Sequence, residues 1–271
     1  MMANMQDSSE TEEFAHLLRK IERERSVPCL GYKDRCVRRR IGVRMRANAV
    51  HTFAEYEQVL DTKPAEWEKL LAALTINVTR FFRDTNAFDA LESIAYPLLR
   101  DTFSDMLEVW SAGCSHGQEP YSLAMGLADT VGLNRFRVEA TDVDVESLAA
   151  ARAGRYAESI LADIAQPRRS RWVSAGDPGV INAELRARVH VLRHDLLCDN
   201  VAPRRFHLIA CRNVIIYFSR ESQALLFDQL FNALVPGGIL MLGKVETLIG
   251  PARDKFESLN LRERMFRRPL T

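Results

Sequence analysis

Glycine and acidic residues follow the apolar segments of this sequence at positions where a ligand could meet the backbone. The segment LEVWSA at 107–112 is followed by Gly113, Gly117 and Glu119. Glycines let a backbone approach a ligand closely, and the first turn of a helix offers unpaired N–H groups. A carboxylate in that turn would repel a phosphate, and the sequence contains neither G-x-G-x-x-G nor G-x-x-x-x-G-K-[ST]. These residues therefore favour a cationic ligand without phosphate.

Further polar residues end or follow the later strand-like segments. Asp142 ends RFRVEATD, where nucleotide-binding sheets keep an acid for the ribose hydroxyls, and Asp144 is a weaker candidate for that role. Asp195 ends VHVLRHD, where its carboxylate and the adjacent N–H would read an adenine edge. Asn213 follows FHLIACR and is expected near a sulfonium or ribose. Since S-adenosylmethionine carries an ammonium, a sulfonium and no phosphate, we expect it as the cofactor.

Each of these residues also has a structural explanation that the sequence leaves open. Asp142 could cap the following helix, and Glu119 could interact favourably with a helix dipole. Asn213 and Asp195 could form turns, and the two glycines could make a tight turn without a ligand. The histidines lack H-E-x-x-H spacing, so we expect no metal site.

The first 75 residues carry helix signals and no strand signal. Capping-box patterns occur at Ser9 with Glu12 and at Thr52 with Glu55, and Pro64 stands at a typical first helical position. Apolar residues recur on one face of two predicted helices: Phe14, Leu17, Leu18 and Ile21 in one, and Val37, Ile41 and Met45 in the other. We predict a small all-helical domain over residues 1–75.

From about residue 105 the pattern changes, and strand signals alternate with helix signals. This alternation predicts an α/β fold with a parallel sheet over residues 105–271, joined to the helical domain by a linker at 76–104. The helix at 221–235 should end at Pro236-Gly237-Gly238, and the tail at 256–269 should add an antiparallel pair. Residues 155–188 are too many for a bare loop and indicate an inserted subdomain. The parallel strands are expected at 106–112, 135–142, 189–195, 206–212 and 237–243.

Composition excludes strong non-specific attraction to polyanions. Lysines and arginines number 37 and acids number 36, a net charge of +1, so no global field drives the molecule to nucleic acid or an anionic membrane. The five cysteines form no C-x-x-C pair, and the sequence has no signal peptide and no long apolar segment. We expect a cytoplasmic protein with free thiols that does not insert into membranes.

A local basic segment is the exception to this balance. Residues 33–46 hold seven basic side chains against one acid, Asp34. Such a segment is either a solvated helix face or a docking face for an acidic partner. RNA is a rival partner, but aromatic residues that stack bases are not interleaved, so we expect no nucleic-acid binding.

Several motifs in one order resemble the chemotaxis receptor methyltransferase family, often called CheR. They are YKDRCVRRRIGVRMR at 32–46, INVTRFFRD at 76–84, WSAGCSHGQEPYSLA at 110–124, TDVD at 141–144, HDLL at 194–197 and CRNVIIYF at 211–218. The resemblance implies a Rossmann-like class I methyltransferase sheet with an N-terminal helical domain and a small β-subdomain inserted at 155–188. It also implies S-adenosylmethionine-dependent esterification of glutamates on chemoreceptor cytoplasmic helices, with the basic segment 33–46 and the insertion as receptor contacts. We expect a monomer.

The resemblance assigns roles to individual residues. Our own candidates for orienting the incoming carboxylate are Arg83 and Tyr217, and Arg83 could instead clamp the methionine carboxylate of the cofactor. A surface arginine and a packed aromatic are the plainer interpretations. Residues 76–104 would include a segment that caps the cofactor, although Asn77 and Thr79 also suit a turn at the domain junction. The implied cofactor-binding residues are Asn77, Thr79, Arg83, Gly113, Glu119, Asp142, Asp195, Leu196, Asn213 and Val214.

Some positions depart from the family pattern. His116 replaces a common threonine, Gln118 a frequent glutamate, and Lys244-Val245 precede Glu246 where His-Ser is frequent. Two other functions therefore stay open. One is S-adenosylmethionine-dependent methylation of a small molecule or another protein. The other is a non-catalytic signalling scaffold that retains the cofactor fold.

Overall fold

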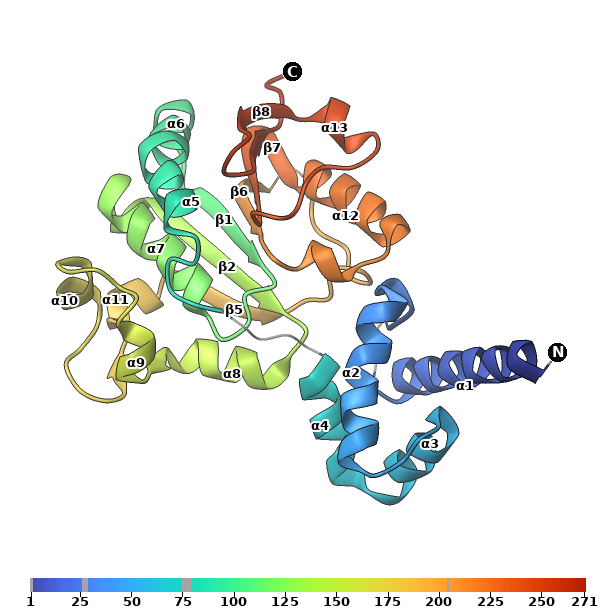
Figure 1. Cartoon of the computed structure of the whole chain (residues 1–271). Helices are drawn as coiled ribbons and strands as arrows, with labels where there is room; N and C mark the ends of the chain where they lie inside the picture. Colours follow the sequence, from blue (N-terminus) through green and yellow to red (C-terminus); the bar gives the residue numbers. More distant parts are fainter. Residues whose placement is uncertain (1, 26–28, 75–78, 204) are drawn as a thin grey trace. The chain divides into compact units, whose positions relative to one another are not determined.

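A computed structural model describes residues 2–25, 29–74, 79–203 and 205–271 of the chain. The chain forms two compact units, which Figure 1 colours along the sequence. The helical unit is Met1–Ile76 with Tyr217–Ser222, and the sheet unit is Asn77–Ile216 with Gln223–Thr271. Among the described residues, no helix is both long and apolar enough to cross a membrane.

The helical unit contains the elements that the sequence predicts before residue 75. They are α1 (Met2–Arg25), η1 (Cys29–Gly31), α2 (Asp34–Ala47), α3 (Phe53–Thr62) and α4 (Pro64–Leu74). Both predicted apolar faces are confirmed, because all seven of their residues are buried in one core. The capping box at Thr52 and Glu55 is present. The prediction that a helix begins at Ser9 is wrong, since α1 starts at Met2 and continues through that position.

The basic segment of α2 is only partly a solvated face. Arg40 is buried, and the Arg44 guanidinium donates two 2.8 Å hydrogen bonds to the Glu66 carboxylate. The Arg38 guanidinium lies 3.9 Å from the centre of the Phe14 ring. These three side chains therefore belong to the packing of the unit. The exposed basic residues of the segment are Lys33, Arg35, Arg39 and Arg46.

The sheet unit alternates strands and helices as predicted. Its sheet strands are β1 (Leu107–Ala112), β2 (Phe136–Asp142), β5 (Val189–Arg193), β6 (Phe206–Cys211), β7 (Leu234–Leu242), β8 (Glu257–Asn260) and β9 (Met265–Arg267). Its longer helices are α5 (Thr85–Ala90), α6 (Tyr96–Thr102), α7 (Gln118–Thr130), α8 (Val145–Ala153) and α12 (Arg220–Ala233). Shorter pieces are η2 (Leu91–Ala95), η3 (Leu133–Arg135), η4 (Ile215–Tyr217) and α13 (Ala252–Lys255). Residues 217–222, from the last residue of η4 to the first turn of α12, are assigned to the helical unit.

The strand order of the main sheet is β5-β2-β1-β6-β7-β9-β8. The first five strands in this order pair in parallel, and β9 pairs antiparallel with β7 and β8. The α/β prediction and the predicted antiparallel tail are therefore confirmed. The chain runs from β1 outward to β2 and β5, then returns to β6 on the other side of β1. This reversal is the place where open α/β sheets bind ligands.

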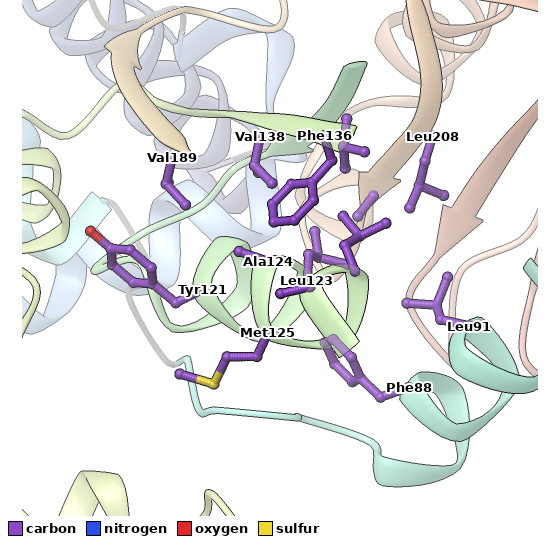
Figure 2. Packing of buried hydrophobic residues seen from close by; sticks show 14 of the residues in the cluster. Phe88, Leu91, Tyr121, Leu123, Ala124, Met125, Phe136, Val138, Val189 and Leu208 are labelled. Atoms are coloured by element: carbon purple, nitrogen blue, oxygen red, sulfur yellow. The ribbon is translucent and has the colours of Figure 1, made fainter. Parts of the chain in front are cut away.

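The core of the sheet unit centres on α7. Figure 2 shows this helix between strand residues such as Phe136 and Val138 and the helical segment that carries Phe88 and Leu91. Residues of α5, η2 and α6 are buried in this same cluster, so much of the segment 76–104 is part of the core. Every residue of β6 is buried, as in a central strand covered on both faces. The rigid centre of the sheet thus fixes where the strands end.

One predicted detail, the end of the helix before Pro236, differs from the structure. Helix α12 ends at Ala233, and β7 starts at Leu234, so Pro236, Gly237 and Gly238 lie inside a strand. The reason is a register shift where β7 joins β6, an irregularity that tolerates proline and a glycine with a φ of +81°. The predicted insertion at 155–188 forms a small subdomain with a two-stranded antiparallel sheet. It pairs β3 (Arg155–Tyr156) with β4 (Gly179–Val180) and adds α9 (Glu158–Leu161), α10 (Arg168–Trp172) and α11 (Ala183–Arg186).

Candidate active site at the strand ends

The loops after β1 and β6 touch each other at the reversal of strand order. A Cβ added at Gly113 would lie 2.4 Å from Cγ2 of Val214, and Gly113 has a φ of +85°. Both facts require glycine there, because a side chain would clash and the backbone is left-handed. The structure therefore brings these two predicted residues together. The tight-turn explanation of Gly113 accounts for its conformation without a ligand.

Asp142 closes the loop that follows β1. Its Oδ2 accepts a 2.9 Å hydrogen bond from the Ser115 N–H, and its Oδ1 accepts one of 3.0 Å from the Asp144 N–H. The helix-cap explanation belongs to Asp144 instead, which accepts from the Glu146 N–H at the start of α8. Burial raises the pKa of the Asp142 carboxyl, and the backbone donors partly oppose that rise. A carboxylate has about four acceptor sites, so this group has capacity for a ligand's hydroxyls.

Glu119 lies in the first turn of α7, beside the end of β1. Its Oε1 accepts a 2.8 Å hydrogen bond from the Ser111 hydroxyl, and its Oε2 lies 3.2 Å from Nη1 of Arg212. Burial raises the pKa of this carboxyl, while Arg212 and Ser111 act in the other direction. Because β1 and β2 are neighbours, two partly buried acids stand at adjacent strand ends.

Arg212 is the functional candidate that sequence reasoning missed. Its side chain is 2% exposed and pairs with Glu119 and, at 2.9 Å, with Oδ2 of Asp84. Its Nη2 also donates a 2.8 Å hydrogen bond to the Arg83 carbonyl. Its place directly after an apolar strand, next to Asn213, is the sequence signal that marks it. Arg212 ties the segment before α5 to the ends of β1 and β6.

Glu246 shapes the loop that holds Asn213 and Val214. Its carboxylate accepts hydrogen bonds from the backbone N–H groups of Asn213 at 2.8 Å, Gly243 at 2.6 Å and Ile216 at 3.2 Å. Asn213 has a φ of +60°, a conformation that asparagine tolerates better than most residues. The turn explanation of Asn213 thus describes its backbone. Its side chain remains a predicted cofactor contact.

The remaining predicted site residues lie in three different parts of the chain. Asp195 and Leu196 are buried after β5, and the Asp195 carboxylate accepts a 2.9 Å hydrogen bond from the Leu197 N–H, which makes a turn. Thr79 and Arg83 are half-buried in the segment before α5. Asn77 lies outside the described residues. Tyr217 is assigned to the helical unit, where its ring lies 4.7 Å from the Arg40 guanidinium.

Comparison with known proteins identifies the family. Residues 77–265 match the family profile described as "CheR methyltransferase, SAM binding domain", and residues 12–75 match "CheR methyltransferase, all-alpha domain". The chain belongs to the CheR methyltransferase family. A chemotaxis protein methyltransferase of Listeria innocua is 33% identical over 249 residues, covering 92% of this chain and 95% of that protein.

A second chemotaxis protein methyltransferase, from Escherichia coli, is 34% identical over 79% of this chain and 77% of its own. A solved structure, the N-methyltransferase NodS of Bradyrhizobium japonicum with S-adenosylhomocysteine, is 18% identical with a TM-score of 0.39 and covers 67% of this chain and 88% of that one. S-adenosylmethionine is the cofactor of the matched CheR domain.

The side chains of this CheR site suit that cofactor. Its two partly buried acids, Glu119 and Asp142, would meet a cationic, hydroxyl-bearing ligand. The buried Arg212 is already matched by Asp84 and Glu119. A phosphate would instead face carboxylates. Among the described residues, no three histidine, cysteine or acidic side chains are grouped to hold a metal ion.

We predict that Arg212→Met destabilises the protein by about 3 to 5 kcal/mol, because it leaves two acids around a buried site without their cation. Urea unfolding measures the change. Arg205→Met is the matched control, since Arg205 pairs with Glu139 at an exposed position and its loss should cost less than about 1 kcal/mol. Equal effects of the two substitutions would contradict the central role of Arg212.

Proposed function

We propose that this CheR protein transfers a methyl group from S-adenosylmethionine to glutamate side chains on chemoreceptor cytoplasmic helices. The product is a glutamyl methyl ester, which removes a negative charge from packed signalling helices. The observation that carries the proposal is the pair of partly buried acids, Glu119 and Asp142, at adjacent strand ends of a CheR cofactor domain. The chemotaxis methyltransferases that resemble this chain support the choice of substrate.

We propose cofactor contacts in two parts of the sequence, the positions that follow the strands and the positions from 77 to 83. We assign the amino end of the cofactor to Gly113 and Glu119 and the ribose hydroxyls to Asp142. The other assigned contacts are Asn77, Thr79, Arg83, Asp195, Leu196, Asn213 and Val214. When bound, S-adenosylmethionine supplies a methyl group activated by its sulfonium.

The reaction requires little acid–base chemistry from the protein. A glutamate side chain has an ordinary pKa of about 4.3 and is therefore already an anion at neutral pH. The protein must align this carboxylate and exclude water, which is catalysis by positioning. Arg83 and Tyr217 are the residues that we assign to orient the carboxylate.

The exposed stripe of α2 is the proposed receptor contact. Arg35, Arg39 and Arg46 are four and seven residues apart, which places them on one side of the helix. All three are exposed, and Val43 beside them is 49% exposed. Such a stripe complements the acidic surface of a helix whose glutamates are methylated. We assign the insertion at 155–188 as a second contact and the cytoplasm as the location.

The direct test is methyl transfer to receptors. Membranes that contain chemoreceptors are incubated with the protein and S-adenosylmethionine labelled on its methyl group. Alkali should then release volatile labelled methanol, because an ester hydrolyses and an N-methyl group does not. Label on another protein or a small molecule would support a different substrate. Cofactor binding without any transfer would support a scaffold.

We predict that Asp142→Asn weakens S-adenosylhomocysteine binding about tenfold or more. A hydrogen bond to a charged group contributes about 1.5 to 3 kcal/mol, and the ribose would lose that assistance. Asp144→Asn is the control, because asparagine caps a helix as well as aspartate does. Calorimetry on both variants decides the assignment, and an unchanged dissociation constant in Asp142→Asn would refute it.

We predict that cofactor binding weakens in mild acid. Burial raises the pKa of both Asp142 and Glu119, and we propose that binding needs both carboxylates ionised. Cofactor affinity is therefore at its full value above the raised pKa values and decreases as the pH falls through them. Affinity should fall by up to about tenfold per pH unit for each carboxylate, and the slope should drop by about one proton in Asp142→Asn. A flat profile down to acid unfolding would contradict this requirement.

We predict that the triple variant Arg35→Ala, Arg39→Ala and Arg46→Ala raises KM for receptor membranes about tenfold or more at low salt. Rim charges mainly steer encounter, so kcat and S-adenosylhomocysteine affinity should change little. Arg23→Ala on α1 is the control, since Arg23 is 69% exposed and lies outside the stripe. An unchanged KM in the triple variant would remove α2 from the receptor contact.

A further inference from the structure

The segment before α5 is held in a conformation that it would not adopt alone. We call residues 79–84, TRFFRD, the capping segment. Phe82 has a φ of +49° and Asp84 a φ of +62°, both in the left-handed region. For a bulky residue such as phenylalanine this is an outlier, and such strain persists only where surrounding contacts impose it. The contacts around the capping segment therefore determine its conformation.

The insertion at 155–188 supplies several of those contacts. Arg80 forms a two-pronged ion pair with Asp163, with Nη2 to Oδ1 at 2.6 Å and Nε to Oδ2 at 3.1 Å. The Phe81 ring meets the Tyr156 ring edge-on, with centroids 5.0 Å apart. The Arg168 guanidinium lies 5.0 Å from the Phe82 ring centre. Three successive residues of the capping segment are thus each held by the insertion.

Arg168 is itself fixed to the core of the sheet unit. It pairs with Glu92 at 3.0 Å and with Asp129 at 2.9 Å, on η2 and α7. The capping segment also touches the core directly, because the Phe82 N–H donates a 3.0 Å hydrogen bond to the Ser122 hydroxyl. Through Arg168, the insertion therefore connects the capping segment to the core of the sheet unit.

Tyr156 extends these contacts to the loop after β1. The Tyr156 hydroxyl donates a 2.8 Å hydrogen bond to the His116 carbonyl. A Cβ added at Gly117 would lie 2.8 Å from the Tyr156 hydroxyl oxygen. One buried side chain therefore touches the capping segment through its ring and the glycine turn through its hydroxyl. Gly117 is needed for this close approach, and its φ is +93°.

We propose that the insertion at 155–188 is a latch that holds the capping segment against the glycine turn, and that Tyr156 and Asp163 are positioning residues that slow cofactor release. The inference rests on the proposed function, because it takes the cofactor to lie at these strand ends. It predicts that the rate of cofactor release depends on side chains that need not touch the cofactor.

Tyr156→Phe tests the latch with a minimal change. The ring contact to Phe81 stays, while the His116 carbonyl loses its donor, so S-adenosylhomocysteine should bind about three- to tenfold more weakly, mainly through faster release. Tyr121→Phe is the matched control. Tyr121 is equally buried and its hydroxyl donates to the Ala151 carbonyl at 2.9 Å, away from the capping segment. Its loss should leave affinity within about twofold of the unaltered protein.

Stopped-flow release and calorimetry separate the two ways in which the idea can fail. If the unaltered protein does not bind S-adenosylhomocysteine, the proposed function falls and the latch falls with it. If it binds, and Tyr156→Phe behaves like Tyr121→Phe, the latch alone is overturned. Weaker binding confined to Tyr156→Phe supports it.

A second experiment needs no cofactor. In Asp163→Asn, amide hydrogen exchange over residues 79–84 should be about two- to fivefold faster, a modest effect because Arg80 is 69% exposed. Glu158→Gln is the control, since it breaks the Glu158–Arg169 ion pair within the insertion and leaves Arg80 untouched. The charge swap Arg80→Asp with Asp163→Arg should restore slow exchange. Equal exchange in Asp163→Asn and Glu158→Gln would overturn the latch.

Discussion

A buried guanidinium requires matching negative charge, and Arg212 meets this requirement with residues from two separate parts of the sheet unit. Asp84 comes from the capping segment and Glu119 from the first turn of α7, while Arg212 itself follows β6. Removing one member of such a group leaves an uncompensated charge in a poorly solvated place. The position of the capping segment, the ionisation of Glu119 and the end of β6 therefore depend on one another. The site cannot be described as a list of independent contacts.

The same physical device recurs at the other loops of the site. Asp142, Asp195 and Glu246 each accept hydrogen bonds from backbone N–H groups of a loop that follows a strand. Loops at the carboxyl ends of strands leave such donors without sheet partners, and a carboxylate can satisfy two or three of them at once. The acids that would contact a ligand are thus also the acids that shape the loops. Structural and ligand-binding explanations of these residues are therefore compatible, and neutral isosteres with neighbouring controls are needed to separate them.

Sequence patterns anticipated what depends on local periodicity. The burial of Phe14 and Val37 follows from spacing, because amphipathic order along a helix determines which side meets the core. The strand at 107–112 follows instead from a short, mostly apolar segment, and it is buried along almost all of its length. The positions of the glycine turn and of Asp142 were predictable because their place at the end of a strand is a sequence property. Arg212, Tyr156 and Asp163 were missed because their roles depend on partners as far away as residues 80, 84 and 116. Pro236 was misassigned since a register shift in the sheet outweighed its usual role as a helix terminator.

The near-zero net charge conceals two local fields of opposite sign, and the proposed reaction needs both. A cationic donor favours the acids at the strand ends, where Arg212 is neutralised within the site. An anionic glutamate on an acidic helix favours exposed cations, which the arginine stripe of α2 supplies. A uniformly acidic protein would repel the receptor, and a uniformly basic one would repel the donor and bind polyanions without selectivity. In the proposed reaction, partly buried, hydrogen-bonded acids and exposed arginines would let one nearly neutral chain attract two reactants of opposite charge.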